Sequence, residues 1–296
     1  MDFQILLTLI NDKDVLVFFL QVLFVAMLLE RLYVHITHKT KLNKSLIMVL
    51  FICLLLSFTY TPRYTFREMP PKVEFGENVT DPYQEIRSLM VGRQLLTRDI
   101  TDSKVLTVMK DVPRHRFIPT ELWGKAHEDH SLPIGYGQTI SQPYIVALMT
   151  QSLSVKPTDK VLEVGTGSGY QAAILSALVE EVYSIEIVPE LAARANRTMK
   201  EVGIKNVWIK AGDGYWGWEE YSPFDAIIVT AAVDHVPPPL LAQLKVGGLL
   251  ILPLGDTRTY QTLTLIEKRS DEEYKLKYIT GVRFVPLTGA GTETNA

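Results

Sequence analysis

Glycines alternate with hydroxyl side chains in Gly165-Thr166-Gly167-Ser168-Gly169, the stretch of this sequence best suited to hold a ligand. Glycines let the polar end of a ligand approach the backbone without a Cβ in the way, and a following helix offers free N–H groups to an anion. Alone, such a turn fits a nucleotide-type ligand or a plain tight turn. Glu186 lies about 20 residues further on, where a carboxylate can accept hydrogen bonds from ribose hydroxyls. Together they indicate a ligand with a ribose.

An acid between two glycines, in Gly212-Asp213-Gly214, adds a third group. Asp213 can accept a hydrogen bond from an adenine amino group, or it can be an ordinary turn aspartate. The order of glycines, Glu186 and Asp213 fits an amino-acid end, a ribose and an adenine, which together make S-adenosylmethionine. NAD fits the glycines and Glu186 equally well, but its chemistry needs a proton-transfer group, and the chain has no Tyr-x-x-x-Lys pair.

Composition excludes several other functions. The single cysteine, Cys53, rules out a disulfide framework and a cysteine-rich metal site within one chain, and no metal-binding cluster is evident. The net charge of −3 gives no basic field for nucleic acid. The chain also lacks the Asn/Asp-Pro-Pro-aromatic tetrapeptide expected of enzymes that methylate the amino groups of bases. We therefore expect neither a metal nor a nucleic-acid partner.

A parallel sheet can bring such groups together, because the carboxyl ends of its strands meet at one edge. An apolar run over 161–164 fits a strand buried on both faces, and a helix over 170–178 follows the glycine turn. Further strands are predicted over 182–186, 206–210, 224–230, 248–253, 260–267 and 276–285. Helices are predicted over 83–96, 102–110, 144–153, 189–202 and 238–244. This alternation predicts an α/β fold with a Rossmann-like doubly wound sheet.

A polar stretch over 132–143 precedes the helix at 144–153. Ser141 within it can cap that helix, with Pro143 tolerated in the first turn, or it can point its hydroxyl into the site. The residues alone favour the cap.

Some other conspicuous side chains have weaker signals. The basic cluster Arg114-His115-Arg116 could hold a carboxylate or form a solvated loop. Trp216 and Trp218 are expected to cover apolar surface. His235 follows the strand at 224–230 without an evident partner acid and is expected to be a loop residue.

Two apolar runs near the N-terminus, over 15–29 and 46–60, predict a helical hairpin in the membrane. Each is near the short limit of the ~17–25 residues that a spanning helix needs, and flanking apolar residues extend both. A pair of buried soluble helices is the alternative, but neither run has the polar face of a surface helix. A cleaved signal peptide is disfavoured, because Asp12 and Asp14 precede the first run and no small-x-small site follows it.

The chain is therefore divided into a membrane hairpin over 1–62, a linker over 63–82 and a catalytic domain over 83–296. The loop between the two runs is basic and, by the positive-inside tendency, should face the cytoplasm, which would put the domain outside. However, further basic residues follow the second run, and a domain that consumes a cytosolic cofactor argues for the opposite orientation. We expect a membrane-anchored protein whose catalytic domain is cytoplasmic.

Several motifs taken together resemble the protein-L-isoaspartate O-methyltransferase family. They are VPRHRFIP at 112–119, IGYGQTISQP at 134–143, VLEVGTGSGY at 161–170, the Gly212-Asp213-Gly214 turn, DAIIVTAA at 225–232 and VRFVPLT at 282–288. They run in order from about Arg93 to Thr288, so the resemblance is far more specific than a single glycine turn. It does not cover the hairpin and linker, which depart from the usual soluble, single-domain member.

This resemblance implies an S-adenosylmethionine-dependent methyltransferase that acts on the free α-carboxylate of L-isoaspartyl residues in damaged proteins. Ser141, in Thr139-Ile140-Ser141, corresponds to the active-site serine of the family, which reverses the preference for a cap; Thr139 is the second catalytic candidate. Thr288 would close over the cofactor from the C-terminal segment. The other residues implied to hold the cofactor are Gly165, Gly167, Gly169, Glu186, Asp213 and Gly214.

The implied reaction needs few acid–base groups. A carboxylate is already ionised at neutral pH, so no general base is required. The protein has to align the carboxylate oxygen with the methyl group and strip water from the nucleophile.

Three rival functions share these residues. A methyltransferase for a different carboxylate, such as a normal aspartate, would bind the same cofactor. A membrane-tethered module could bind the cofactor or damaged chains without catalysis, although its catalytic loop would then be expected to be broken. An NAD oxidoreductase would bind NAD in preference to S-adenosylhomocysteine.

Overall fold

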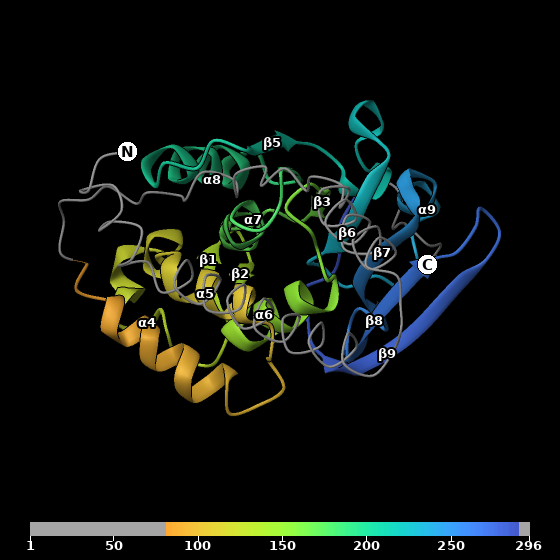
Figure 1. Ribbon diagram of the computed structural model, residues 1–296. Coiled ribbons are helices and arrows are strands. Elements are labelled where there is room, and N and C mark those ends of the chain that lie inside the picture. Colours follow the sequence, from red (N-terminus) through yellow and green to blue (C-terminus); the bar gives the residue numbers. More distant parts are fainter. Residues whose placement is uncertain (1–80, 290–296) are drawn as a thin grey trace, which may run out of the picture. The chain divides into compact units, whose positions relative to one another are not determined.

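A computed structural model describes residues 81–289 of the chain. Its centre is a seven-stranded sheet in the order β5-β4-β3-β6-β7-β8-β9 (Figure 1). Strands β5 to β7 in this order pair in parallel, and the last two pairs are antiparallel. The strands are β3 (Lys160–Val164), β4 (Glu181–Glu186), β5 (Val207–Ala211), β6 (Phe224–Val229), β7 (Leu244–Gly255), β8 (Gln261–Lys268) and β9 (Tyr274–Val282). The predicted α/β fold with a mostly parallel sheet is confirmed.

The central strands are mainly apolar because both of their faces are buried. Side chains alternate between the faces of a strand, so Val161 joins one hydrophobic core and Leu162 and Val164 join the other. The same alternation places Val182 in the first core and Tyr183 in the second. This alternation also turns Glu163, which follows Leu162, to the face of Val161.

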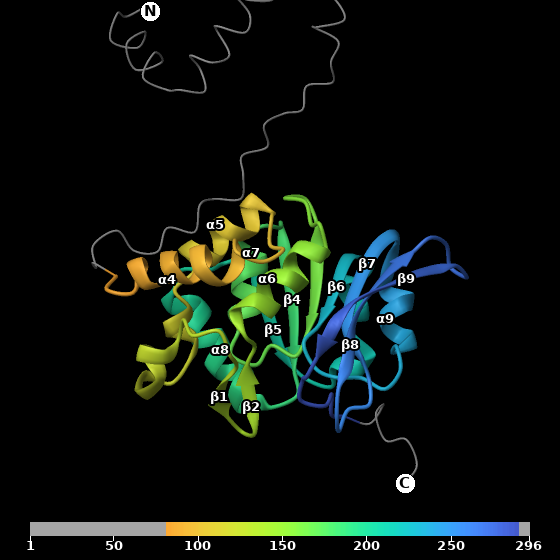
Figure 2. The same ribbon diagram turned by 90° about the horizontal axis from the view of Figure 1, so that it is seen from below.

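Most helices cover the first face, where their apolar residues share a core with Val161 (Figure 2). They are α4 (Gln84–Met90), α5 (Ser103–Asp111), α6 (Pro143–Ser152), α7 (Tyr170–Ser176) and α8 (Pro189–Glu201). The second face is covered by α9 (Pro238–Gln243) and by residues of the short turns η4 (Gly214–Trp216) and η5 (Glu219–Tyr221). Every residue of α7 is buried, which explains why this helix shows no polar face.

The helix ends follow the expected local rules. The Asp102 side chain caps α5 by accepting hydrogen bonds from the amides of Lys104, at 2.8 Å, and Val105, at 3.2 Å. Helices α6, α8 and α9 all carry proline in their first turn. The bounds of the observed helices and strands agree with the predicted ones to within a few residues.

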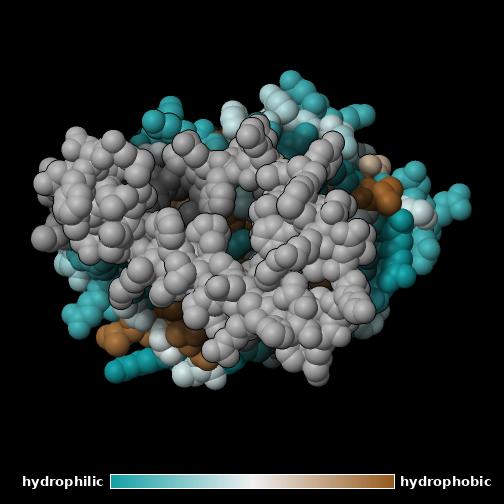
Figure 3. Space-filling model, viewed as in Figure 1, coloured by the Kyte–Doolittle hydropathy of each residue, from teal (hydrophilic) through white to brown (hydrophobic). Residues whose placement is uncertain are grey.

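The helix predicted over 83–96 is not one regular α-helix. It continues from α4 into a π-helical turn, η1 (Val91–Leu95). Of its apolar residues, Met90 packs into the core, whereas Ile86 and Leu89 stay exposed. Brown atoms are visible over this helix in the space-filling view (Figure 3).

A small antiparallel pair, β1 (Leu132–Gly135) and β2 (Gln138–Ile140), was not predicted. Pro133 and the glycines of this stretch are uncommon in strands, so the sequence there resembles a loop. The connection passes through Tyr136 and Gly137, both with positive φ. This hairpin leads directly to Ser141.

The predicted membrane hairpin over 1–62 lies outside the described residues. Within 81–289, no helix has the length and apolar character required to cross a membrane.

Candidate active site

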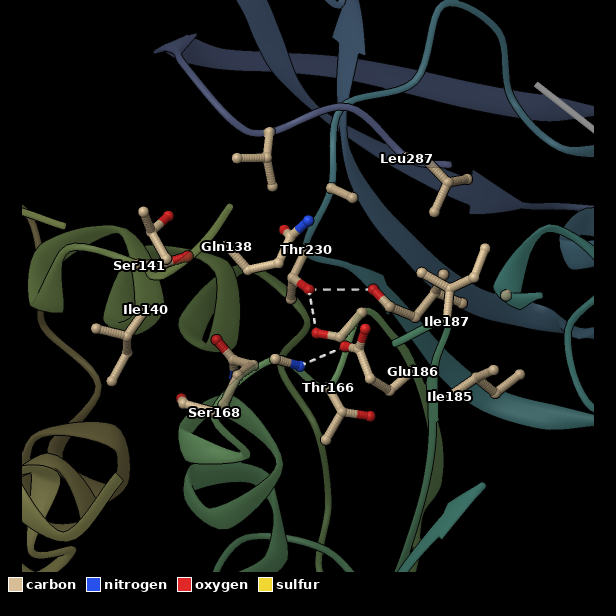
Figure 4. A pocket seen from close by; sticks show the side chains of 18 of the residues that line it. Gln138, Ile140, Ser141, Thr166, Ser168, Ile185, Glu186, Ile187, Thr230 and Leu287 are labelled. Atoms are coloured by element: carbon tan, nitrogen blue, oxygen red, sulfur yellow. Dashed lines mark hydrogen bonds between the residues drawn. The ribbon is translucent and has the colours of Figure 1, made fainter. Parts of the chain in front are cut away.

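A cavity of about 750 Å³, open to solvent, lies at the carboxyl ends of β3, β4 and β6 (Figure 4). The chain leaves β3 in one direction along the sheet to reach β4, and β6 lies on the other side of β3. Ligands of doubly wound sheets bind where the strand order reverses in this way. The cavity is lined by residues from the segments 138–141, 164–168, 170–171, 185–187, 230–231 and 285–288, with Val146 and Gly214.

The glycine turn approaches β6 very closely at Gly165. Its φ is +96°, and a Cβ there would lie 2.5 Å from Thr230 Oγ1. The Thr230 hydroxyl lies 3.1 Å from the carbonyl oxygen of Val164 and 2.5 Å from that of Gly165, to which it can donate (Figure 4). Thr230 thus ties the turn to the neighbouring strand. The sequence places Thr230 at the end of the strand predicted over 224–230, and no role was assigned to it. Its position at the carboxyl end of that strand, where ligands of such sheets bind, was the available signal.

Glu186 also holds the glycine turn in place. One carboxylate oxygen accepts from the Gly167 amide at 2.7 Å, and the other accepts from the Val188 amide at 2.9 Å. The side chain is buried and lines the cavity. Because each carboxylate oxygen can accept more than one hydrogen bond, Glu186 can shape the turn and still receive a ligand hydroxyl.

Most amides of the glycine turn itself form hydrogen bonds within the protein. The Gly165 and Thr166 amides both donate to the Ile185 carbonyl, and the Gly169 amide donates to that of Thr166. With the Gly167 amide bound to Glu186, these groups are used inside the protein. The glycines therefore provide close approach rather than an anion cradle.

Two of the predicted cofactor residues do not line the cavity. Gly169 is the N-cap residue of α7 and has a φ of +88°. A Cβ there would lie 2.9 Å from Met199 Cε in α8, so the glycine allows α7 and α8 to pack closely. Asp213 caps η4 by accepting from the Tyr215 amide at 3.0 Å, as a turn aspartate does. The turn that it caps presents Gly214 to the cavity.

Ser141 lines the cavity and is not the cap of α6 (Figure 4). The N-cap position belongs to Gln142, which forms no side-chain capping bond. Thr139, one strand position from Ile140, lines the same wall. The interpretation of Ser141 as a helix cap is therefore wrong.

The C-terminal segment closes the opposite wall. The Ala232 amide donates to the Val285 carbonyl, and the Leu287 amide donates to the Ala232 carbonyl, each at 2.8 Å. These bonds anchor the segment beside the tip of β6 and place Thr288 among the lining residues, where it was predicted.

Four polar side chains of the cavity are available to a ligand. Within residues 81–289, the side chains of Gln138, Thr139, Ser141 and Thr288 form no hydrogen bond. Among the described residues that line the cavity, only Glu186 and Tyr170 can ionise, and Tyr170 is buried, with burial raising its pKa. No group of three or more His, Cys, Asp or Glu side chains in the described range is placed to hold a metal ion.

A buried polar chain behind the turn was missed by sequence reasoning. The Ser184 hydroxyl donates to Glu163, and the hydroxyls of Ser184 and Thr166 lie 2.6 Å apart. The pKa of Glu163 is raised to about 8, mainly by burial and also by the nearby carboxylate of Glu186, although hydrogen bonds from the Ser184 hydroxyl and the Ala172 amide act to lower it. An acidic residue inside an otherwise apolar strand was the available signal.

We expect Glu163→Gln to flatten the pH dependence of stability. Because the folded pKa of about 8 exceeds the ordinary value of 4.5, the folded state binds the extra proton between these values, and stability falls as pH rises through this window. Between about pH 5 and about pH 8 the wild-type protein should lose on the order of 3 kcal/mol more than the variant. Urea unfolding at both pH values measures the difference. Glu121→Gln, at an exposed site, should match the wild type, and equal slopes for all three proteins would contradict the assignment.

The remaining conspicuous residues are placed as follows. The basic cluster lies in the turn η2 (Arg114–Phe117) and not in the cavity wall: Arg114 and His115 are buried, whereas Arg116 is exposed to solvent. His235 does have a partner acid, because its ring lies 2.6 Å from Asp234 and 2.9 Å from the Tyr215 hydroxyl. The tryptophans differ: Trp218 packs on the second core, whereas Trp216 is exposed, contrary to expectation.

Comparison with known proteins identifies relatives over the described part of the chain. A profile of the family described as Protein-L-isoaspartate(D-aspartate) O-methyltransferase (PCMT) matches residues 87–292. Protein-L-isoaspartate O-methyltransferase 2 of Shewanella sediminis is 55% identical over 210 residues, which cover 71% of this chain and 86% of that protein. Protein-L-isoaspartate O-methyltransferase of a Picosynechococcus strain is 48% identical over 222 residues, which cover 75% of this chain and 97% of that protein.

Solved structures agree with the sequence relatives. A beta-aspartate methyltransferase (PCMT) from Plasmodium falciparum, in complex with S-adenosyl-L-homocysteine, aligns with a TM-score of 0.60 and 27% identity, covering 68% of this chain and 98% of that chain. A second structure, a protein-L-isoaspartate O-methyltransferase, aligns with a TM-score of 0.62 and 30% identity, covering 70% of this chain and 66% of that chain. The motifs, the cavity at the strand switch and these matches agree, and the chain belongs to the protein-L-isoaspartate(D-aspartate) O-methyltransferase family.

Proposed function

We propose that this chain transfers a methyl group from S-adenosylmethionine to the free α-carboxylate of L-isoaspartyl residues in proteins. The observation that carries this proposal is the lack of a free acid or base among the described residues that line the cavity. Glu186, the single carboxylate there, already accepts two backbone hydrogen bonds. A reaction that begins with proton removal lacks a base in this wall, whereas an ionised carboxylate needs none.

The cofactor fits the residues that are present. Bound S-adenosylmethionine supplies a methyl group on a positively charged sulfur, which is a good leaving group. Gly165 and Gly167 allow close approach at the turn, Glu186 can accept ribose hydroxyls, and Gly214 and Thr288 form opposite parts of the wall. Gly169 and Asp213 contribute indirectly, through the packing of α7 and the turn that presents Gly214.

The substrate carboxylate is assigned to the wall that contains Ser141. The hydroxyls of Ser141 and Thr139 and the amide of Gln138 are neutral donors without other partners in the described range, so they can orient a carboxylate without neutralising it. Orientation is the main requirement for this transfer, because the nucleophile is already charged. The carboxylate oxygen forms the bond to the methyl carbon as the carbon–sulfur bond breaks, which yields a methyl ester and S-adenosylhomocysteine.

Repair then follows from the chemistry of the ester. The methyl ester is a better acylating group than a carboxylate, so the neighbouring backbone nitrogen attacks its carbonyl and releases methanol, which forms a succinimide. Water opens the succinimide to isoaspartate or to normal aspartate. The chain is needed only for the methylation.

The decisive test compares one peptide in its isoaspartyl and aspartyl forms. Radioactive methyl from S-adenosylmethionine should label the isoaspartyl form and leave the aspartyl form unlabelled. Preferential labelling of the aspartyl form would indicate the rival carboxylate methyltransferase. Binding of S-adenosylhomocysteine without labelling of either peptide would indicate a non-catalytic module, and tighter binding of NAD would indicate an oxidoreductase.

We also propose that residues 1–62 anchor this domain to a membrane, with the domain on the cytoplasmic side. The two apolar runs over 15–29 and 46–60 support the anchor, and the use of a cytosolic cofactor supports the side. In intact cells, protease added outside should leave the domain uncut. Cleavage of the domain under those conditions would show that it lies on the outer side of the membrane. Recovery of the whole chain in the aqueous fraction would show that residues 1–62 do not anchor it.

A further inference from the structure

A fully buried arginine, Arg114, lies directly behind the wall that contains Ser141. Its Nη2 donates to the Ser141 carbonyl oxygen at 2.7 Å, and its Nε donates to the Ala126 carbonyl oxygen at 2.7 Å. One planar side chain therefore joins the segment at Ala126 to the segment at Ser141. The peptide group of Ser141 cannot shift without breaking the first of these bonds.

The same guanidinium also contacts the helix α7. Its central carbon lies 4.8 Å from the centre of the Tyr170 ring, which suits a cation–π contact. Tyr170 is the first residue of α7 after the glycine turn, and it lines the cavity. Arg114 thus links the assigned substrate wall to the helix that follows the cofactor turn.

The charge of Arg114 is not neutralised within the described part of the chain. There it forms no ion pair, and its Nη1 has no hydrogen-bond partner. Burial lowers the pKa of Arg114 to about 10, so the side chain stays protonated at neutral pH. A buried cation without a carboxylate partner is costly for folding alone. This positive charge would favour binding of a substrate whose carboxylate lies beside Ser141, since electrostatic interactions are strong in a poorly solvated site.

We propose that Arg114 is a positioning residue for methyl transfer, which fixes the Ser141 peptide group and provides positive charge behind the substrate carboxylate. This inference rests on the proposed function. Alignment within a few tenths of an ångström matters for such a transfer, and a misplacement of about 1 Å can cost roughly 10²-fold in rate. The expected effect of losing Arg114 is therefore on turnover and on peptide binding, with little effect on the cofactor.

A second buried arginine provides a matched control. Arg87 donates to the Lys110 carbonyl oxygen at 2.8 Å and pairs with Asp81, and none of these residues lines the cavity. Replacing either arginine by lysine retains a positive charge and removes the fork that reaches two acceptors. Both changes should therefore lower the melting temperature, but only the change at Arg114 should alter the chemistry.

The experiment compares Arg114→Lys and Arg87→Lys with the wild-type protein on an isoaspartyl peptide. For Arg114→Lys we expect kcat/KM for the peptide to fall by roughly 10²-fold, while calorimetry gives a dissociation constant for S-adenosylhomocysteine within a factor of about two of the wild type. Arg87→Lys should keep both values. Arg114→Ala adds a second measurement: free guanidinium at millimolar concentration should restore part of its activity and should leave the activity of Arg87→Ala unchanged.

Each result has a defined meaning. Wild-type kcat/KM in Arg114→Lys would overturn the inference, as would parallel losses of peptide turnover and S-adenosylhomocysteine binding. If Arg114→Ala does not fold, the lysine variant alone decides. A wild-type protein that is inactive on the isoaspartyl peptide would refute the proposed function itself, which separates that failure from a failure of the role of Arg114.

Discussion

Replacing Gly165 by alanine should lower the affinity for S-adenosylhomocysteine by about 10²-fold or more, because positive φ at a non-glycine residue costs about 1–3 kcal/mol and a steric conflict adds to it. The new Cβ would lie 2.5 Å from Thr230 Oγ1, at a residue with φ +96°. The conflict is relieved when the turn moves away from β6 or when the Thr230 side chain rotates, and either change breaks the hydrogen bond from Thr230 to the Gly165 carbonyl oxygen. Isothermal calorimetry measures the loss of affinity.

The control for this substitution is Gly92→Ala, because a Cβ at Gly92 has nothing within 4 Å and its φ is not positive. That variant should bind S-adenosylhomocysteine like the wild type. The double variant Gly165→Ala with Thr230→Ala removes the oxygen that the new Cβ meets and should recover part of the affinity. Undiminished binding by Gly165→Ala itself would show that this turn is not the cofactor site.

Replacing Ser141 by alanine should lower kcat by roughly 10²–10³-fold, the range observed when one preorganised hydrogen-bond donor is removed from an active site. The hydroxyl lines the cavity and has no partner within residues 81–289, so its loss leaves the protein's own hydrogen bonds intact. The affinity for S-adenosylhomocysteine and the melting temperature should therefore change little. Steady-state rates on an isoaspartyl peptide, combined with calorimetry, separate the two effects.

Ser152→Ala is the matched control for this second substitution. The Ser152 hydroxyl donates to the Leu148 carbonyl oxygen within α6, and the residue does not line the cavity. Its turnover should equal that of the wild type. Equal losses of turnover and of cofactor affinity in Ser141→Ala would remove Ser141 from the role of orienting the substrate.

The two substitutions address opposite walls of one cavity, and the sequence indicated both walls for different reasons. The glycine turn follows from local chemistry: an apolar run, a turn that needs positive φ and a series of good helix formers. Ser141 did not follow from local chemistry, which favoured a helix cap. The resemblance to the family corrected that preference, and the structure places Gln142 at the cap.

The sequence by itself determined the order and type of the main elements, because the period of apolar residues and the chemistry of turns act over a few neighbouring residues. It also indicated that the groups after β3, β4 and β5 would meet at one edge of the sheet, although of the turn after β5 it is Gly214, and not Asp213, that lines the cavity. The small β1–β2 hairpin was not predictable in this way, because its strands are short and contain residues that disfavour strands.

The tertiary structure alone decided which polar groups face the cavity and which serve the protein. Whether Glu186 binds Gly167, whether Gly169 packs against α8 and whether Arg114 is buried behind Ser141 depend on contacts between segments far apart in the chain. Hydrogen bonding and burial are set by such contacts, and residue type and spacing do not specify them. The sequence therefore located the site. The packing of the sheet, the hairpin and the C-terminal segment decided which of its residues face the cavity and which form contacts within the protein.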